Sequence, residues 1–146
     1  MIRRMATIHK EILVDAAPEV VWEALKDYGA LHEKLAVGFV TDARMEGDDR
    51  IVTFFTGAVA RERLVGIDEE ARRIAYSVSE SPMGFTHHMA SAQVFAEGEQ
   101  ARFVWITDCL PHEVAGFVDD FMGRGLLALK KTLEGVTPGR EVRPGV

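Results

Sequence analysis

The spacing of hydrophobic residues changes along the 146-residue chain, and each change indicates a different kind of element. Residues 18–28 and 111–133 carry apolar side chains at intervals of three and four, the period of a helix that packs on one face. Residues 37–110 instead show a period of two and are divided by turn sequences such as Gly47–Asp49, which is typical of hairpins. Thr7–Val14 is short and rich in β-branched residues, and it predicts one further strand before the first helix.

Six strands are expected in the middle of the chain, each joined to the next by a short turn. Consecutive antiparallel strands of this kind lie side by side, so they predict a meander. With the strand at 7–14 they make a curved, seven-stranded antiparallel sheet, and the fold class is α+β. The six strands cover residues 39–45, 50–56, 60–67, 73–79, 86–95 and 102–110.

The helix expected over residues 111–133 is the element around which the sheet is predicted to wrap. At about 1.5 Å per residue it is roughly 33 Å long, about the width of a small domain. Two short helices after the first strand are expected to support one end of the sheet. We expect a single domain over residues 1–135 and a flexible C-terminal tail over 136–146, which is rich in proline and glycine.

Composition and charge argue against several functions. A net charge of −6 without a basic patch disfavours nucleic-acid binding and anionic membranes. No apolar run approaches the roughly 20 residues of a membrane span, and the N-terminus lacks the apolar centre of a signal peptide, so a cytoplasmic protein without membrane insertion is expected. The single cysteine, Cys109, excludes an internal disulfide. The histidines are not spaced as metal ligands, so we expect neither a metal nor a cofactor.

The predicted order of strand, two helices, six strands and long helix resembles the helix-grip fold of the START and SRPBCC superfamily. This superfamily includes the polyketide cyclase/dehydrase-like proteins and the birch-pollen-allergen group. The segments that carry the resemblance are DAAPEVVWEAL at 15–25, GDDR at 47–50, ARERLVGIDEEARRIAYSV at 60–78 and RFVWITDCLP at 102–111. The ERL-x-x-I-D stretch at 62–68 is also similar to the branch that contains the plant abscisic-acid receptors. The resemblance implies a ligand cavity between the sheet and the last helix.

The resemblance also implies which side chains face that cavity. Matching the chain to the family's motifs gives these cavity-facing positions: Glu62, Tyr76, Met89, Ser91, Trp105, Phe117, Phe121 and Gly125. Phe54 is added because it belongs, with several of these residues, to a set of aromatic and thioether side chains. From composition alone, that set would be interpreted as ordinary core.

Glu62 is the first candidate catalytic residue. Alternation along its strand places it on the same face as Ala60 and Leu64, which is the predicted interior. Burial would raise the pKa of an unpaired carboxyl there, so that it could donate or accept a proton. In the alternative interpretation, Glu62 pairs with an arginine or lysine and is structural.

His87 is the second candidate. It is adjacent to His88 on one predicted strand, so the two rings point to opposite faces and cannot bind one metal together. The sequence leaves open which ring faces the cavity, although His87 shares the parity assigned to Met89 and Ser91. An exposed histidine near the mouth of the cavity is the competing interpretation.

Three functions fit this pattern. The first is a carrier, sensor or binding protein for a small hydrophobic or aromatic molecule, oriented by Glu62 and Tyr76. The alternative is a polyketide cyclase- or dehydratase-like enzyme in which Glu62 or His87 transfers a proton. The third is an interaction module whose cavity is incidental. A small hydrophobic ligand is the expected partner, and the sequence is compatible with a homodimer without specifying one.

Overall fold

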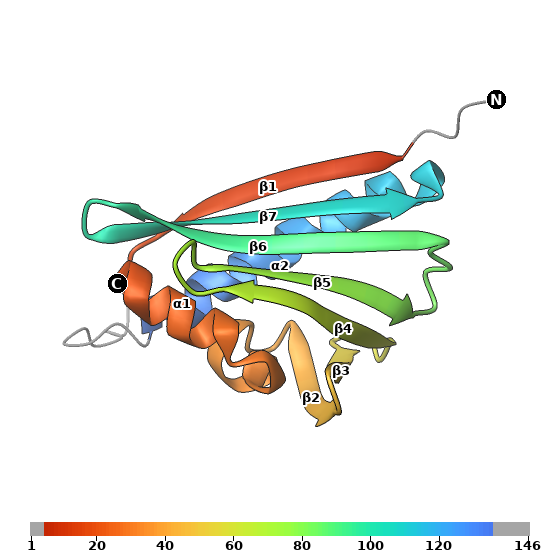
Figure 1. The fold of residues 1–146 in the computed structure, drawn as a ribbon, viewed down its shortest axis with the longest axis horizontal. Coiled ribbons are helices and arrows are strands. Elements are labelled where there is room, and N and C mark those ends of the chain that lie inside the picture. Colours follow the sequence, from red (N-terminus) through yellow and green to blue (C-terminus); the bar gives the residue numbers. More distant parts are fainter. Residues whose placement is uncertain (1–4, 136–146) are drawn as a thin grey trace.

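A seven-stranded antiparallel sheet curves around one long helix in the computed structural model, which describes residues 5–135 (Figure 1). The sheet and the closing helix confirm the predicted helix-grip α+β fold. The predicted tail at 136–146 lies outside the described residues. The strands are β1 (Ala6–Val14), β2 (Val40–Glu46), β3 (Asp49–Phe54), β4 (Val59–Asp68), β5 (Arg73–Glu80), β6 (His87–Glu97) and β7 (Gln100–Leu110).

The strand order is β1-β7-β6-β5-β4-β3-β2, so every strand after β2 pairs with its neighbour in sequence and the first strand pairs with the last. After β1 the chain forms α1 (Pro18–Lys26) and two short helical turns, η1 (Tyr28–Ala30) and η2 (Leu31–Leu35). Pro18 suits the first turn of α1 because its missing N–H would have no helical partner there. These elements carry the chain from one edge of the sheet to the other.

The closing helix, α2 (Ala115–Gly135), crosses one face of the sheet (Figure 1). It begins four residues later than the predicted start at residue 111, because His112–Val114 form a separate short turn, η3. Phe117 was expected on its apolar side, yet this residue is 59% exposed. The buried residues of α2 recur at helical spacing: Val118, Met122, Gly125, Leu126, Leu129 and Leu133.

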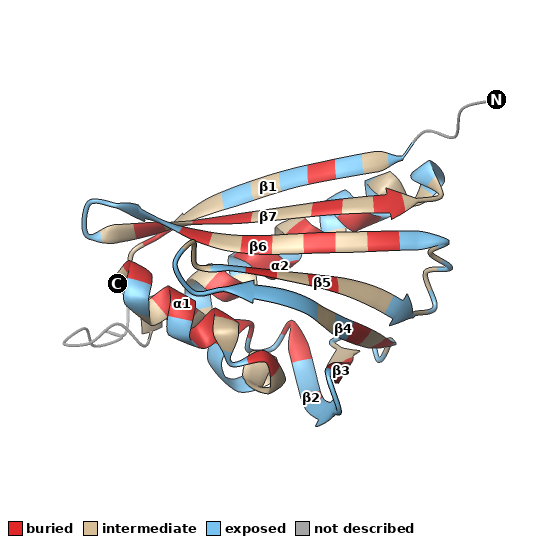
Figure 2. Cartoon of the chain, in the orientation of Figure 1, coloured by how far each residue is buried: buried red, intermediate tan, exposed pale blue. Residues whose placement is uncertain are grey.

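The core consists of three groups of buried side chains. The largest joins α1, the middle strands and the C-terminal half of α2. A second surrounds Phe39 and Val52, and a third joins Ile8, Cys109 and Met122. In Figure 2, buried and less buried residues alternate along β6 and β7, as expected for strands with one face on a core.

Candidate functional site

A cavity of about 460 Å³ lies between the sheet and α2. Members of all three core groups line it, including Leu25, Phe39 and Met122. Its size lies within the range of roughly 300–1,000 Å³ that is typical of small-molecule sites. The core groups therefore surround an open space instead of merging into one solid core.

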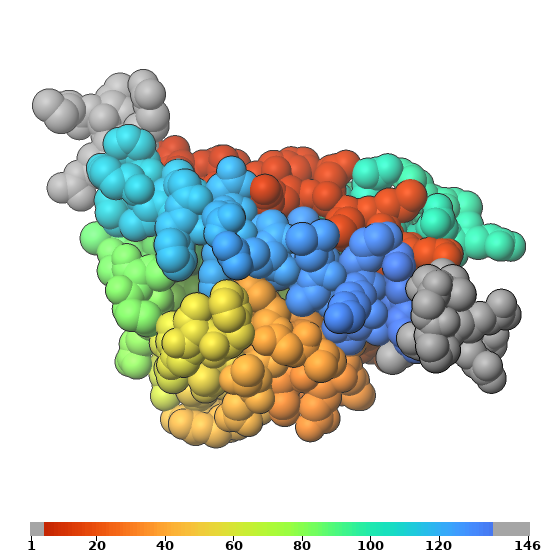
Figure 3. Space-filling model, turned by 180° about the vertical axis from the view of Figure 1, so that it is seen from behind, coloured from red at the N-terminus to blue at the C-terminus, as the bar shows by residue number. Residues whose placement is uncertain are grey.

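The mouth of the cavity lies where three segments meet at the surface. They are the connection between β3 and β4, the connection between β5 and β6, and the N-terminal part of α2. Figure 3 shows this face, with α2 crossing it beside the yellow β3–β4 region and the green β5–β6 region. Exposed residues from all three segments also line the cavity: Thr56, Val59, Pro82 and Phe117. A ligand can therefore enter beside the first turns of α2.

Four phenylalanines form an aromatic wall on the α2 side. The ring of Phe121 lies 4.7 Å from that of Phe39 and 4.8 Å from that of Phe54, measured between centroids. Phe117 stacks on Phe121 at 5.9 Å. Sequence reasoning identified three of these residues as cavity-facing. It placed Phe39 at the start of a predicted strand over 39–45 without assigning it to the cavity, and in the structure Phe39 lies just before β2.

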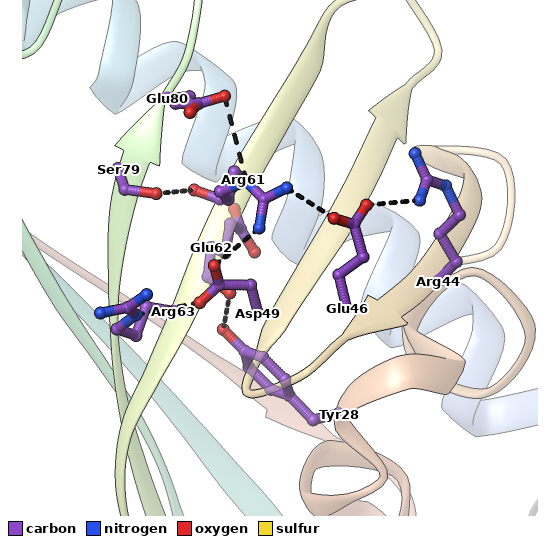
Figure 4. A network of polar contacts seen from close by, with 9 residues as sticks. All are labelled: Tyr28, Arg44, Glu46, Asp49, Arg61, Glu62, Arg63, Ser79 and Glu80. Carbon is purple, nitrogen blue, oxygen red and sulfur yellow. Dashed lines mark hydrogen bonds and ion pairs between the residues drawn. The ribbon is translucent and has the colours of Figure 1, made fainter.

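Glu62 is buried in an ion pair with Arg50, which agrees with the structural interpretation of this residue. Arg50 Nε donates to Glu62 Oε1 over 2.7 Å, and the two side chains are only 5% and 8% exposed. Arg50 Nη1 also donates to the Tyr28 carbonyl, and the guanidinium lies 3.8 Å from the Tyr28 ring centroid. The Tyr28 hydroxyl in turn donates to the Glu62 carbonyl (Figure 4). Glu62 is therefore not the unpaired acid that a proton-transfer role would need.

Arg50 was missed from the sequence although a signal for it exists. It has the same parity as Phe54 on β3, and antiparallel pairing places it directly opposite Glu62 on β4. A buried arginine is expected only beside an acidic partner, so a buried Glu62 should have directed attention to it.

The outer face of the same hairpin carries a separate network of charged side chains (Figure 4). Asp49 accepts hydrogen bonds from Arg63 and Arg61, which lower the pKa of its carboxyl. Arg61 also bonds to Glu46. Because these side chains point away from the cavity, they hold the register of β2, β3 and β4 and leave the inner face to Arg50.

The predicted inward face of β6 is wrong. His88 lines the cavity, whereas His87, Met89 and Ser91 do not. The alternation was correct but its phase was shifted by one residue, which moves every side chain to the opposite face. Tyr76 determines the phase, because it faces the cavity and pairs with Ala90 on β6. The inward assignment of Met89 and Ser91 came from matching this strand to the family's motif, and that match was one residue out of phase.

Seven of the nine predicted cavity-facing positions do line the cavity, and their part in binding stays a prediction. They come from β3, β4, β5, β7 and α2, so the fold brings distant segments together. These positions are Phe54, Glu62, Tyr76, Trp105, Phe117, Phe121 and Gly125.

One side of the cavity carries a small polar cluster formed by Tyr76, His88, Trp105 and Thr107. Trp105 Nε1 donates to the Tyr76 hydroxyl over 2.9 Å. His88 Nδ1 accepts the Val78 backbone N–H over 3.0 Å, so in the neutral ring the proton lies on Nε2. Burial, with a smaller contribution from the charge of His87, lowers the pKa of His88 to about 4. Burial also raises the pKa of Tyr76 well above its ordinary value.

These groups are arranged for hydrogen bonding and poorly arranged for removing a proton. The carboxylate of Glu62 is neutralised by Arg50, and the free nitrogen of neutral His88 already bears a proton. Within residues 5–135, no three His, Cys, Asp or Glu side chains come together as a metal site. Over the same residues, no helix combines the length and apolar character required to cross a membrane.

Comparison with known proteins gives one family match and several similar structures. No curated protein matches the chain. The protein XoxI from Bacillus cereus superposes with a TM-score of 0.78 at 20% identity, over 88% of this chain and 95% of that one. A START superfamily protein from Mycobacterium smegmatis gives 0.73 at 14% identity, over 90% and 99% of the two chains. Ginseng major latex-like protein 151 from Panax ginseng gives 0.73 at 18% identity, over 88% and 97%.

At these identities the structural matches show the fold alone. The family model described as polyketide cyclase / dehydrase and lipid transport matches residues 5–135, which include every strand and helix described above. The chain therefore belongs to the polyketide cyclase/dehydrase and lipid transport family, and it shares its fold with the START superfamily protein named above.

Proposed function

We propose that this protein binds a small hydrophobic or aromatic molecule in the cavity between the sheet and α2, as a carrier or sensor. The observation that supports this most strongly is the cavity itself, about 460 Å³ in volume and lined mainly by aliphatic and aromatic side chains. A small number of polar groups in a mostly apolar pocket is the usual form of a site that orients a small ligand.

The enzymatic alternative receives less support from the same geometry. Its two candidate groups were Glu62 and His87. Glu62 is held by Arg50, and His87 is exposed and does not line the cavity. A proton-transfer reaction would need a group that can change its protonation state beside the substrate. Ligand binding requires no such group.

Native mass spectrometry of the protein purified from its own cells tests the proposal. We expect a co-purifying small molecule that is released when the protein is unfolded. Diphenylmethane, a compact apolar probe, should also bind the emptied protein in isothermal titration. The proposal is wrong if the protein carries no molecule and also fails to bind the probe.

Two glycines of α2 provide a matched pair of variants that tests the position of the binding site. A Cβ at Gly125 would lie 3.0 Å from the Trp105 ring and 3.2 Å from the Phe39 ring, whereas a Cβ at Gly123 would meet the flexible Lys10 side chain, with Nζ at 3.5 Å and Cε at 3.9 Å. Gly125→Ala should push these two cavity-lining rings inward, at a cost of about 1–3 kcal/mol. We expect weaker binding of diphenylmethane by this variant.

Gly123→Ala is the control. It should raise the free energy of unfolding by up to about 1 kcal/mol, because alanine favours the helix over glycine, and it should leave probe affinity unchanged. Titration and urea unfolding measure the two quantities. Equal affinity in the two variants would place the ligand somewhere other than beside Gly125.

A further inference from the structure

We infer that the ligand is a neutral molecule with a carbonyl oxygen, which the side chains of Tyr76, His88 and Thr107 hold by hydrogen bonds at one side of the cavity. This inference rests on the proposed function and specifies the chemical class of the ligand.

The three side chains are brought together by the register of β5, β6 and β7. Tyr76 pairs with Ala90, and Ala90 pairs with Thr107, so one row crosses all three strands. His88 precedes Ala90 by two residues and therefore shares its face. Because Ala90 has a small side chain, Tyr76 and Trp105 can meet across β6 and form their hydrogen bond.

All three groups are buried, at 6% exposure for Tyr76, 8% for His88 and 2% for Thr107, and all three line the cavity. The Tyr76 hydroxyl accepts from Trp105. Within residues 5–135, the fully enclosed side-chain atom without a hydrogen-bond partner is His32 Nδ1, so His88 Nε2 and the Thr107 hydroxyl are not such enclosed atoms, and both residues line the cavity. A few polar groups in the wall of a mostly apolar cavity are the usual means of orienting a small ligand, so these three indicate where a polar atom of the ligand lies.

The direction of these hydrogen bonds defines the ligand. His88 Nδ1 already accepts from Val78, so Nε2 can only donate. Tyr76 already accepts from Trp105, which leaves its own proton to donate. The Thr107 hydroxyl can donate or accept. The cluster therefore offers at least two donors among neighbouring side chains of the cavity wall, with the Tyr76 and His88 ring centroids 5.9 Å apart, which fits an acceptor such as a carbonyl oxygen and not an amine.

The charges of the lining argue that this acceptor is neutral. Among the described residues that line the cavity, only Arg50 and Glu62 are ionised, and they neutralise each other. A carboxylate would therefore enter a mainly apolar cavity without a free cation to balance it. An ammonium group would lack a free anion and would also face hydrogen-bond donors. A ketone, aldehyde or quinone oxygen needs no counter-charge.

Four probes with one diphenyl skeleton test the inference: benzophenone, diphenylmethane, diphenylacetate and benzhydrylammonium. Isothermal titration of the full-length protein should show benzophenone binding roughly tenfold more tightly than diphenylmethane, since its oxygen pairs the buried donors. The two charged probes should bind more weakly than benzophenone. The carbonyl stretching band of bound benzophenone should move to lower wavenumber, because hydrogen bonds weaken the C=O bond.

Two variants withdraw a donor from the cavity. Asparagine at position 88 can still accept from Val78 through Oδ1, and its own donor, Nδ2, is nearer to the backbone than histidine Nε2, while Thr107→Val replaces a hydroxyl by a methyl group of similar size. His88→Asn and Thr107→Val should each reduce the preference for benzophenone over diphenylmethane about three- to tenfold and reduce the infrared shift. Ser91→Ala, on the opposite face of β6, should change neither quantity.

The possible results separate this inference from the proposed function. If all four probes fail to bind, the inference is wrong, and the proposed function fails with it when no small molecule co-purifies either. If diphenylmethane binds as tightly as benzophenone, the cavity binds apolar molecules but the carbonyl inference is wrong. Tightest binding by diphenylacetate or benzhydrylammonium would likewise overturn the inference while supporting a ligand-binding role.

Discussion

Arg50→Met is expected to lower the free energy of unfolding by about 3–5 kcal/mol. The substitution removes the cation that neutralises Glu62, whose side chain is only 8% exposed. It also removes the hydrogen bond to the Tyr28 carbonyl and the contact of the guanidinium with the Tyr28 ring. An isolated buried carboxylate is costly, whereas methionine itself fits an apolar site. Urea unfolding monitored by circular dichroism measures the loss.

A second variant and a surface control make this expectation specific. Arg50→Met combined with Glu62→Leu should recover most of the lost stability, because replacing both charges leaves no unpaired ion. Arg124→Met removes a similar side chain from an exposed pair with Asp120 and should cost no more than about 1 kcal/mol. If Arg50→Met destabilises no more than Arg124→Met, the buried pair does not have the role assigned to it here.

Acidification from pH 6.5 to pH 4 is expected to remove about 3 kcal/mol of stability through His88 alone. The pKa of this ring is about 4 in the folded protein, against 6.5 for an unperturbed histidine. The unfolded chain therefore binds the proton first as the pH falls, which favours unfolding throughout this window. Above about pH 7.5 both states are neutral at this position, so the contribution no longer depends on pH.

The pH dependence is measured by urea unfolding of the wild type and His88→Asn at several pH values between 4 and 7.5. Carboxylates also titrate in the lower part of this window, so the informative quantity is the difference between the two proteins. The variant should lose less stability on acidification. His112→Asn, at an exposed histidine, should follow the wild type. Parallel curves for His88→Asn and the wild type would contradict the burial of a neutral ring.

Local sequence patterns were sufficient to predict the helices and strands, but not to predict which side chains of every strand point inward. The alternation in β4 placed Glu62 inside correctly because Ala60 and Leu64 flank it with apolar side chains. In β6 the alternating residues are alanines, a serine and a methionine, whose hydrophobic contrast is too weak to give the phase. The phase of β6 follows from its pairing with β5, and that pairing links residues distant in sequence.

The contrast between local patterns and contacts between distant segments also explains which parts of the candidate site could be predicted. Aromatic residues such as Phe54, Phe121 and Trp105 could be assigned to the interior because their size and position in a periodic pattern are local properties. The pairing of Arg50 with Glu62 and of Tyr76 with Trp105 could not, since each depends on which strands become neighbours. Arg50 is harder to assign than the other residues of these pairs because it directly follows the Gly47–Asp49 turn, so few alternating residues precede it.

By itself, the sequence determined that this chain forms one antiparallel sheet closed by a long helix, because the two hydrophobic periods and the turn residues act over short distances. Only the tertiary structure decided that Glu62 is neutralised, that His88 and not His87 faces the cavity, and that Tyr76, His88 and Thr107 line the same cavity. Those outcomes depend on strand register and on side chains packed from several elements at once. Hydrogen-bond direction and charge balance in a cavity are properties of that assembly.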